Sequence, residues 1–371
     1  MKIFHLINSL GAGGAERVLS NLCINDKNNT HVICTLLGED EYSYQIKNNS
    51  IRVYHLNILK NKLSFLNIFQ LYLILKKENP EILQSWLYHS DLIGSIFGTI
   101  CGIKKIIWNI RHTDISSLNM KNSTKILVRI CAIISKFVPN KIIYCSKISL
   151  KEHEMIGYNK KKSHLIYNGV DINIFKPTRQ NKDKKALKSK KDIFKIGMVA
   201  RFNHYKNHIG LIDVMKLLEL NDIKFHCYLI GKNIDSKNKI LVDYIHKLGI
   251  SNKFSLLGYK DNMPDILNML DLHILLTYSE SFPNVIAEAM SCGVPCISSN
   301  EGEAKKIISK NGYILKGNNK KEVFDKIIQI INIKKNNSEW VKLKRNCKMH
   351  IEKNFSLQLM IDNYNRLWKS L

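Results

Sequence analysis

The chain has 371 residues, of which 45% are hydrophobic, and carries a formal net charge of +26. This length favours two domains of roughly 150–200 residues over one. No uninterrupted apolar run reaches the roughly 18 residues that would span a membrane, and no secretory leader pattern follows Met1, so we expect a cytoplasmic protein. The basic charge predicts attraction to anionic partners, without choosing among nucleic acid, lipid head groups and diphosphates.

The first half of the sequence alternates short β-branched runs with helical patterns. A strand is predicted at residues 2–7, then a glycine turn and a helix near residues 15–23. Further strands are predicted at residues 31–37, 51–56, 82–86, 105–109 and 141–145. This alternation is typical of a parallel sheet covered by helices on both faces.

The second half repeats the scheme and ends in an amphipathic helix at residues 357–371. Strands are predicted at residues 194–200, 224–230, 254–257, 272–276 and 295–298, and helices near residues 208–219, 236–247, 263–270 and 284–291. We therefore predict an α/β fold with two Rossmann-like, doubly wound domains that face each other across a cleft. The expected division is a first domain at 1–175, a basic linker at 176–192, a second domain at 193–354, and a helix at 355–371 packing back toward the first domain.

The nine cysteines form no C-x-x-C pair and follow no spacing pattern. Several lie inside apolar runs, as Cys23 and Cys131 do. Such a set is typical of reduced thiols that serve as small hydrophobic side chains in the cytosol.

Two glutamates eight positions apart follow the predicted strand at 272–276. Glu280 falls in a loop, and Glu288 falls just over one turn into a helix that Asn284 is expected to cap. Free N–H groups at a helix start attract anions, and one carboxylate can hold the two adjacent hydroxyls of a ribose. The residues alone leave two alternatives equal: a sugar-nucleotide site, or a loop cap and a surface helix residue.

A basic pair, Arg201 and Lys206, follows the predicted strand at 194–200. Two cations in one loop can hold a diphosphate from two sides and neutralise the charge that develops on it as a leaving group. The sequence contains no Asp-x-Asp pair of the kind that holds Mg²⁺ in many nucleotide-sugar enzymes. We therefore predict that side-chain cations replace a metal.

Two loops of the first half also contain candidate residues. Gly13 and Gly14 lie between the first strand and the first helix, where the backbone can approach a ligand closely, although a plain tight turn is the alternative. His112 follows the strand at 105–109 and can form a hydrogen bond with a reacting sugar, although a lone histidine is more often structural. A similar loop at residues 86–91 is expected to shape the acceptor side, and its His89 is the alternative histidine.

The segment from Glu280 to Pro295 resembles the E-x-F-x-x-x-x-x-E-A-M-A-x-G-x-P signature of family 4 glycosyltransferases, which are retaining enzymes with two Rossmann-like domains (the GT-B architecture). The pair R-x-x-x-x-K at Arg201, the turn G-G-A-E-R at Gly13 and the run N-G-V-D at Asn168 are also similar to this family. One departure is Ser281, where the family commonly has glycine. We expect Ser281 to influence the choice of sugar.

The resemblance implies a role for each candidate residue. The implied catalytic residues are His112, Glu280, Arg201 and Lys206. The donor diphosphate would be bound by Gly13, Gly14, Arg201 and Lys206, the donor sugar by His112, Glu280, Phe282, Pro283 and Asn284, and the ribose by Glu288.

The implied function is transfer of a sugar, with retention, from a nucleotide diphosphate donor to a hydroxyl of a glycan or lipid-linked acceptor. A UDP-sugar is favoured, no cofactor or metal is expected, and the setting is cell-surface polysaccharide or lipooligosaccharide synthesis. The alternatives are a nucleotide-sugar epimerase of the same architecture and a basic polyanion-binding protein without catalysis. No nucleic-acid-binding motif occurs, so no nucleic acid partner is expected.

Two basic amphipathic stretches, residues 60–77 and 121–136, have two interpretations. Their apolar side chains can pack on the sheet, or they can dock on the anionic membrane surface where lipid-linked acceptors reside. Peripheral contact with the inner face of the cytoplasmic membrane therefore remains an open expectation.

Overall fold

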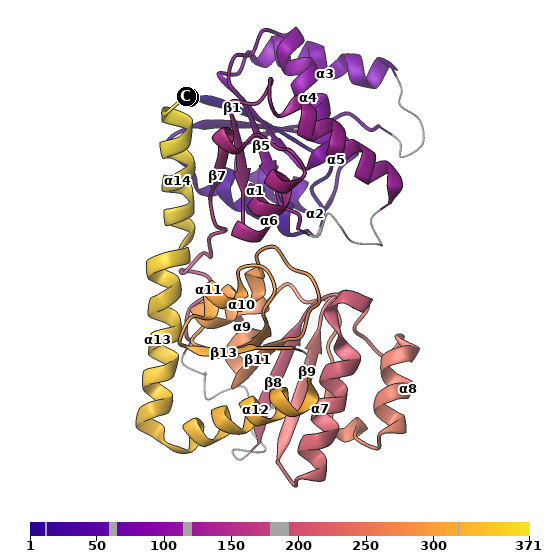
Figure 1. The fold of residues 1–371 in the computed structure, drawn as a ribbon, viewed down its shortest axis with the longest axis vertical. Helices are drawn as coiled ribbons and strands as arrows, with labels where there is room; N and C mark the ends of the chain where they lie inside the picture. Colours follow the sequence, from indigo (N-terminus) through magenta and orange to yellow (C-terminus); the bar gives the residue numbers. More distant parts are fainter. Residues whose placement is uncertain (12, 59–64, 114–120, 179–192, 318) are drawn as a thin grey trace. The chain divides into compact units, whose positions relative to one another are not determined.

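The computed structural model describes residues 1–11, 13–58, 65–113, 121–178, 193–317 and 319–371. The chain divides into two compact units (Figure 1). Unit 1 comprises Met1–Gly169 and Leu357–Leu371, and unit 2 comprises Val170–Ser356. The chain therefore leaves unit 1 six residues before the boundary predicted at residue 175, and most of the predicted linker lies outside the described residues.

Unit 1 is built on a sheet of seven parallel strands in the order β3-β2-β1-β4-β5-β6-β7. The central strands are buried on both faces, as parallel sheets require. The strands are β1 (Lys2–Ile7), β2 (Thr30–Thr35), β3 (Arg52–His55), β4 (Ile82–Trp86), β5 (Ile106–Ile110), β6 (Lys141–Tyr144) and β7 (Ser163–Leu165). The sequence patterns predicted the first six, whereas the three-residue edge strand β7 was missed.

Helices cover both faces of this sheet and enclose two hydrophobic cores (Figure 1). One face packs against α1 (Gly14–Asn25), α2 (Glu41–Asn48) and α14 (Leu357–Lys369). The other packs against α3 (Phe65–Glu78), α4 (Tyr88–Ile100), α5 (Asn122–Ile134) and α6 (Lys147–Met155). Although α14 ends the chain, it belongs to the core of unit 1, because Trp368 is fully buried there and donates a hydrogen bond to Gln84 Oε1 at 2.8 Å.

A buried chain of hydrogen bonds supports the α14 side of the sheet. Trp86 Nε1 donates to His5 Nδ1 at 3.2 Å, so His5 carries its proton on Nε2 and donates to His31 Nδ1 at 2.9 Å. His31 Nε2 in turn donates to Asp26 Oδ2 at 3.1 Å. Burial alone would raise the pKa of Asp26, but hydrogen bonds from His31 and its neighbours hold that pKa well below the ordinary value.

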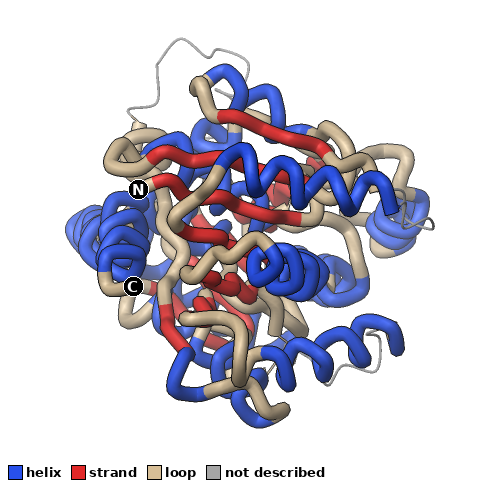
Figure 2. The backbone as a smooth tube through the Cα atoms, turned by 90° about the horizontal axis from the view of Figure 1, so that it is seen from above, coloured by secondary structure: helices blue, strands red, loops and turns tan. Residues whose placement is uncertain are grey.

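Unit 2 has a six-stranded parallel sheet in the order β10-β9-β8-β11-β12-β13. Its strands are β8 (Phe194–Val199), β9 (Phe225–Ile230), β10 (Phe254–Leu256), β11 (Leu272–Leu275), β12 (Cys296–Ser299) and β13 (Gly312–Leu315). Its helices are α7 (His208–Leu220), α8 (Lys239–Lys247), α9 (Met263–Met269), α10 (Asn284–Ser291), α11 (Ala304–Ile308), α12 (Lys320–Lys335) and α13 (Asn337–Phe355). Strands and helices alternate along the chain from β8 to α12. Figure 2 distinguishes the helices, strands and loops by colour.

The predicted fold class, two parallel-sheet Rossmann-like units, is confirmed. All nine cysteines are free, and all but Cys101 are buried, in agreement with their predicted packing role. Among the described residues, no helix is both long enough and apolar enough to cross a bilayer.

Removal of the Trp368 side chain tests whether α14 is part of the core of unit 1. We expect Trp368→Ala to lower the free energy of unfolding by about 3–5 kcal/mol, because it leaves a cavity and an unpaired Gln84. Lys369→Ala, at the next and exposed position, should change it by less than about 0.5 kcal/mol. Urea unfolding followed by circular dichroism measures both, and equal effects would contradict the assignment.

Candidate functional site

The predicted donor-site residues of unit 2 lie at the carboxyl ends of two paired strands. Arg201 and Lys206 follow β8, and Glu280 follows β11. Their loops are joined by hydrogen bonds to the carbonyl of Tyr205, from the backbone N–H of Tyr278 at 2.8 Å and from the hydroxyl of Thr277 at 3.1 Å. As a result, Lys206 Nζ forms an ion pair with Glu280 Oε1.

The local sequence fixes the backbone around Lys206. Asn203 caps a single 3₁₀ turn, and its Oδ1 accepts the Lys206 backbone N–H at 3.1 Å. Asn207 adopts a left-handed conformation (φ +49°), which asparagine tolerates better than most residues, and caps α7 through a bond from Gly210 N–H. The Lys206 and Glu280 side chains are only 16% and 17% exposed, so their pairing is better shielded from water than an ordinary surface ion pair.

The segment from Glu280 to Glu288 differs from the prediction in one respect. Pro283, not Asn284, occupies the N-cap position of α10, and no side chain caps the helix there. Asn284 is therefore the first residue of the helix and not its cap. Phe282 is buried and packs edge-on against Phe355, with ring centroids 5.7 Å apart.

Glu288 is 6% exposed, which removes the interpretation of this residue as a surface helix residue.

Two glycines that the sequence patterns did not single out support these loops. Gly231 follows β9 with φ +146°, and an added Cβ would lie 2.2 Å from the carbonyl oxygen of Ala200. Gly302 follows β12 with φ +57°, and its Cβ would lie 2.3 Å from the carbonyl oxygen of Ser281. The loops that contain Gly231 and Gly302 therefore lie in close contact with the backbone beside Arg201 and Glu280. The available signal was a glycine within three residues of the end of a strand.

His273 is a third supporting residue that sequence reasoning missed. It is fully buried in β11, and burial lowers its pKa to about 3, which keeps the ring neutral. Its Nε2 accepts the backbone N–H of Val199 at 3.3 Å, two residues before Arg201. The carboxyl end of β8 is thereby fixed to β11.

The remaining predicted residues belong to unit 1. Gly13 is the N-cap residue of α1 and Gly14 its first residue, and no side chain caps this helix end. His112 lies two residues beyond β5 and is exposed, with its ring stacked on Tyr88 at a centroid distance of 6.0 Å. The alternative histidine, His89, is exposed in the first turn of α4.

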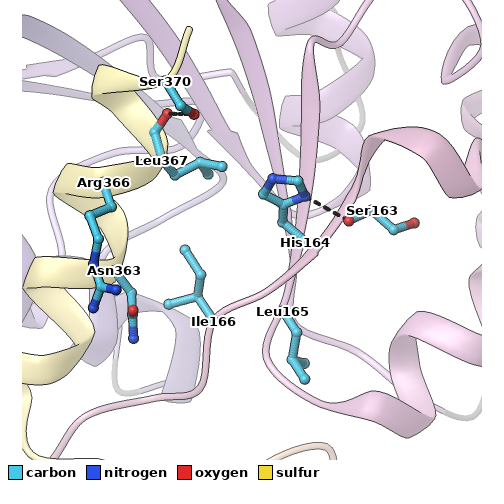
Figure 3. A pocket seen from close by; sticks show the side chains of 8 residues that line it. All are labelled: Ser163, His164, Leu165, Ile166, Asn363, Arg366, Leu367 and Ser370. Carbon is cyan, nitrogen blue, oxygen red and sulfur yellow. Dashed lines mark hydrogen bonds between the residues drawn. The ribbon is translucent and has the colours of Figure 1, made fainter.

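Two other features of unit 1 fall outside this set. A cavity of about 440 Å³ lies between β7 and α14 (Figure 3). It contains no predicted site residue and is lined by Ser163, His164, Leu165, Ile166, Asn363, Arg366, Leu367 and Ser370. Within the described residues, His5, Cys23 and His31 are close enough to share a metal ion. The hydrogen-bond chain described above already uses the facing nitrogens of both histidines, so these residues do not fit a metal site.

The two parallel-sheet, Rossmann-like units are the architecture of the GT-B class of glycosyltransferases. Comparison with known protein families agrees with this assignment. The family described as "Glycosyl transferases group 1" matches residues 179–346, and "Glycosyltransferase Family 4" matches residues 12–174. The chain belongs to the family 4 glycosyltransferases.

Several known proteins are similar over most of their length. One relative is the UDP-Gal:alpha-D-GlcNAc-diphosphoundecaprenol alpha-1,3-galactosyltransferase of Escherichia coli. It is 23% identical, and the match covers 86% of this chain and 84% of the relative's chain. A second relative, of Campylobacter jejuni, is 29% identical over 81% of this chain and 82% of its own. It is the N-acetylgalactosamine-N,N'-diacetylbacillosaminyl-diphospho-undecaprenol 4-alpha-N-acetylgalactosaminyltransferase. These relatives favour glycosyl transfer over epimerisation and over polyanion binding without catalysis.

Among solved structures, HepE of Anabaena in complex with UDP and glucose matches with a TM-score of 0.85. It is 20% identical, and the match covers 100% of both chains. This structural similarity supports the assignment of the two-unit, Rossmann-like fold.

Substitution of Gly302 tests whether it positions the Glu280 loop. We expect Gly302→Ala to weaken nucleotide-sugar binding by roughly tenfold or more, because a methyl group would displace the Glu280–Ser281 backbone. The matched control is Gly249→Ala, since Gly249 also has positive φ (+69°) but no atom within 4 Å of an added Cβ. It should cost only about 1 kcal/mol of stability and leave binding unchanged. Titration calorimetry with UDP-sugars measures the difference, and equal affinities would contradict the assignment.

Proposed function

We propose that this glycosyltransferase uses a UDP-sugar as donor and a lipid-linked glycan as acceptor, and that it transfers the sugar with retention and without a metal ion. The observation that carries the donor site is the Lys206–Glu280 pair at the reversal of the unit 2 sheet. UDP is favoured because HepE, a similar fold, was solved with UDP and glucose. A lipid-linked acceptor is favoured because the names of both relatives above contain a diphosphoundecaprenol acceptor.

The ion pair supports a specific exchange of partners on donor binding. A diphosphate offers Lys206 a stronger anion than one carboxylate, so Lys206 turns to the phosphates together with Arg201. Glu280 is then released to accept hydrogen bonds from hydroxyls of the donor sugar, beside the Phe282–Asn284 backbone. Glu288 holds the ribose, and the two cations stabilise the UDP leaving group.

We assign the unit 1 residues to the roles that the family resemblance implies. His112 would form a hydrogen bond with the donor sugar, and the turn of Gly13 and Gly14 would face the diphosphate at the amino end of α1. Retention would follow if the leaving diphosphate helps to deprotonate the acceptor hydroxyl, and unit 1 would supply the acceptor contacts.

A surface of unit 1 supports docking to an anionic membrane. Along α5 and just beyond it, Ile126, Ile130, Ile133 and Phe137 are all exposed, and their spacing places them on one side of the helix. We call these four residues the α5 stripe. The neighbouring helix α4, which packs against both α5 and α3, also has exposed apolar residues, Ile96 and Ile100.

The charge beside the α5 stripe favours lipid over a protein partner. Arg129 and Lys136 are exposed next to it, and the sequence contains no acidic residue between Asp114 and Glu152. Exposed apolar side chains with only basic neighbours are typical of helices that lie in an anionic lipid interface. We propose that unit 1 contacts the inner face of the cytoplasmic membrane through this stripe.

The donor site predicts metal-independent release of UDP. The protein should release UDP from a UDP-sugar in the presence of EDTA, and Lys206→Ala should lower kcat/KM by roughly 100-fold, since it removes a cation from the leaving group. Lys253→Ala is the matched control, because Lys253 pairs with Glu219 at 3.0 Å elsewhere in unit 2. A panel of nucleotide sugars in a coupled UDP or GDP assay tests this. Strict dependence on Mg²⁺ would overturn the metal-free mechanism, and the absence of turnover with every donor would overturn the proposed donor.

The membrane proposal predicts a selective loss of lipid binding. Replacing Ile130, Ile133 and Phe137 by serine should reduce co-sedimentation with phosphatidylglycerol vesicles by roughly tenfold, because the buried apolar area is lost. The same change at Leu220 and Ile240, which are exposed in unit 2, should have no effect. Binding that is unchanged by the first variant would exclude the α5 stripe as the docking surface.

A further inference from the structure

His112 is exposed, but two buried residues from different helices hold it in place. Its ring stacks on that of Tyr88 in α4, which is 3% exposed, at an interplanar angle of 30°. Its carbonyl oxygen accepts the hydroxyl of Ser149 in α6, which is fully buried, at 2.5 Å. The ring and the backbone of His112 are therefore each fixed by a different part of unit 1.

These two supports are joined through a buried histidine, His153. His153 Nδ1 lies 2.7 Å from the carbonyl oxygen of Ser149, and because a carbonyl only accepts, Nδ1 carries the proton. Burial lowers the pKa of His153 to about 4, so the ring is neutral near pH 7 and its Nε2 is unprotonated. Nε2 accordingly accepts the hydroxyl of Tyr88 at 2.8 Å. Every donor and acceptor role in this connection is thus defined.

The residue before His112 is fixed from the other side of the sheet. The Arg111 guanidinium donates to Asn168 Oδ1 and to the hydroxyl of Tyr364 in α14, and it lies over the Trp86 ring at 4.9 Å. The backbone that carries His112 is therefore held by groups in both cores of unit 1.

We propose that Tyr88 and Ser149, connected through His153, are positioning residues that hold His112 in the orientation that sugar transfer requires. They do not touch the substrate. This inference rests on the proposed function, which assigns His112 to the donor sugar. An exposed histidine samples several rotamers, whereas a reacting group must be held to within a fraction of an ångström, so a buried support of this kind raises the fraction of productive geometry.

Two conservative variants test the proposal on the full chain. Tyr88→Phe keeps the ring but removes its bond to His153, and Ser149→Ala removes the bond to the His112 carbonyl. We expect each to lower the kcat of UDP release from the UDP-sugar by roughly tenfold. The affinity for UDP should stay unchanged, because the proposed function assigns His112 to the donor sugar, whereas UDP is assigned to Gly13, Gly14, Arg201, Lys206 and Glu288.

The matched control is Tyr158→Phe. Tyr158 is also buried, and its ring packs edge-on against His153 at 4.9 Å, but its hydroxyl donates to the carbonyl of Val128 instead. This control should keep kcat within about twofold of the wild type. A loss of kcat as large as that of Tyr88→Phe would show a general effect of core tyrosines and would overturn the proposal.

A double-mutant cycle separates positioning from a merely structural role. In the His112→Ala background, Tyr88→Phe and Ser149→Ala should cause no further loss of kcat, because the residue that they position is gone. If the two substitutions lower kcat by the same factor in the wild-type and the His112→Ala backgrounds, the proposal is overturned.

A second measurement does not depend on turnover. The imidazole signals of His112 in ¹H–¹⁵N spectra should shift in Tyr88→Phe and in Ser149→Ala, but not in Tyr158→Phe. If the wild type releases UDP from no nucleotide sugar, the proposed donor fails. If the His112 signals are the same in all variants, the positioning role itself fails.

Discussion

The candidate site depends on one constraint, the parallel arrangement of the strands. All strands of a parallel sheet end at the same edge, so loops far apart in sequence share that edge. In unit 2 the strand order reverses between β8 and β11, and there Lys206 meets Glu280 across 74 positions of sequence. In unit 1 the reversal lies between β1 and β4. The Gly13–Gly14 turn follows β1 and Tyr88 follows β4, while His112 follows the adjacent β5. Topology alone therefore gathers both sets of residues.

The position of these loops depends on particular residues in the neighbouring strands, loops and helices. Gly231 and Gly302 let neighbouring backbone approach to a distance that any side chain would prevent, and His273 joins two strands through one hydrogen bond. In unit 1, α14 contributes Tyr364 to Arg111 and Asn109, so the end of the chain stabilises the loop that precedes His112. The basic residues of the protein have two different proposed roles. A few lysines and arginines serve the proposed diphosphate site, and others flank the α5 stripe.

Most of the fold was predictable because buried parallel strands have an unambiguous pattern. Runs such as residues 2–7 and 82–86 are short, β-branched and bounded by turn residues, and the structure reproduces their limits. Edge strands are short and only partly buried, which weakens their apolar signal, and of the edge strands of the two sheets β3 and β10 were predicted whereas β7 and β13 were missed. Asn284 was wrongly expected to cap α10, because capping depends on the entry path of the chain, and Pro283 already occupies that position.

By itself the sequence determined the fold class, the family, and the positions of Arg201, Lys206, Glu280 and Glu288, since these follow from local pattern and motif. Only the tertiary structure decided that Lys206 and Glu280 form a pair, that Glu288 is buried, and that Tyr88, Ser149 and His153 support His112. The physical reason is that a motif specifies residues along one segment. A hydrogen bond between α4 and α6, or a contact between a glycine and a distant carbonyl, arises only from how the segments pack.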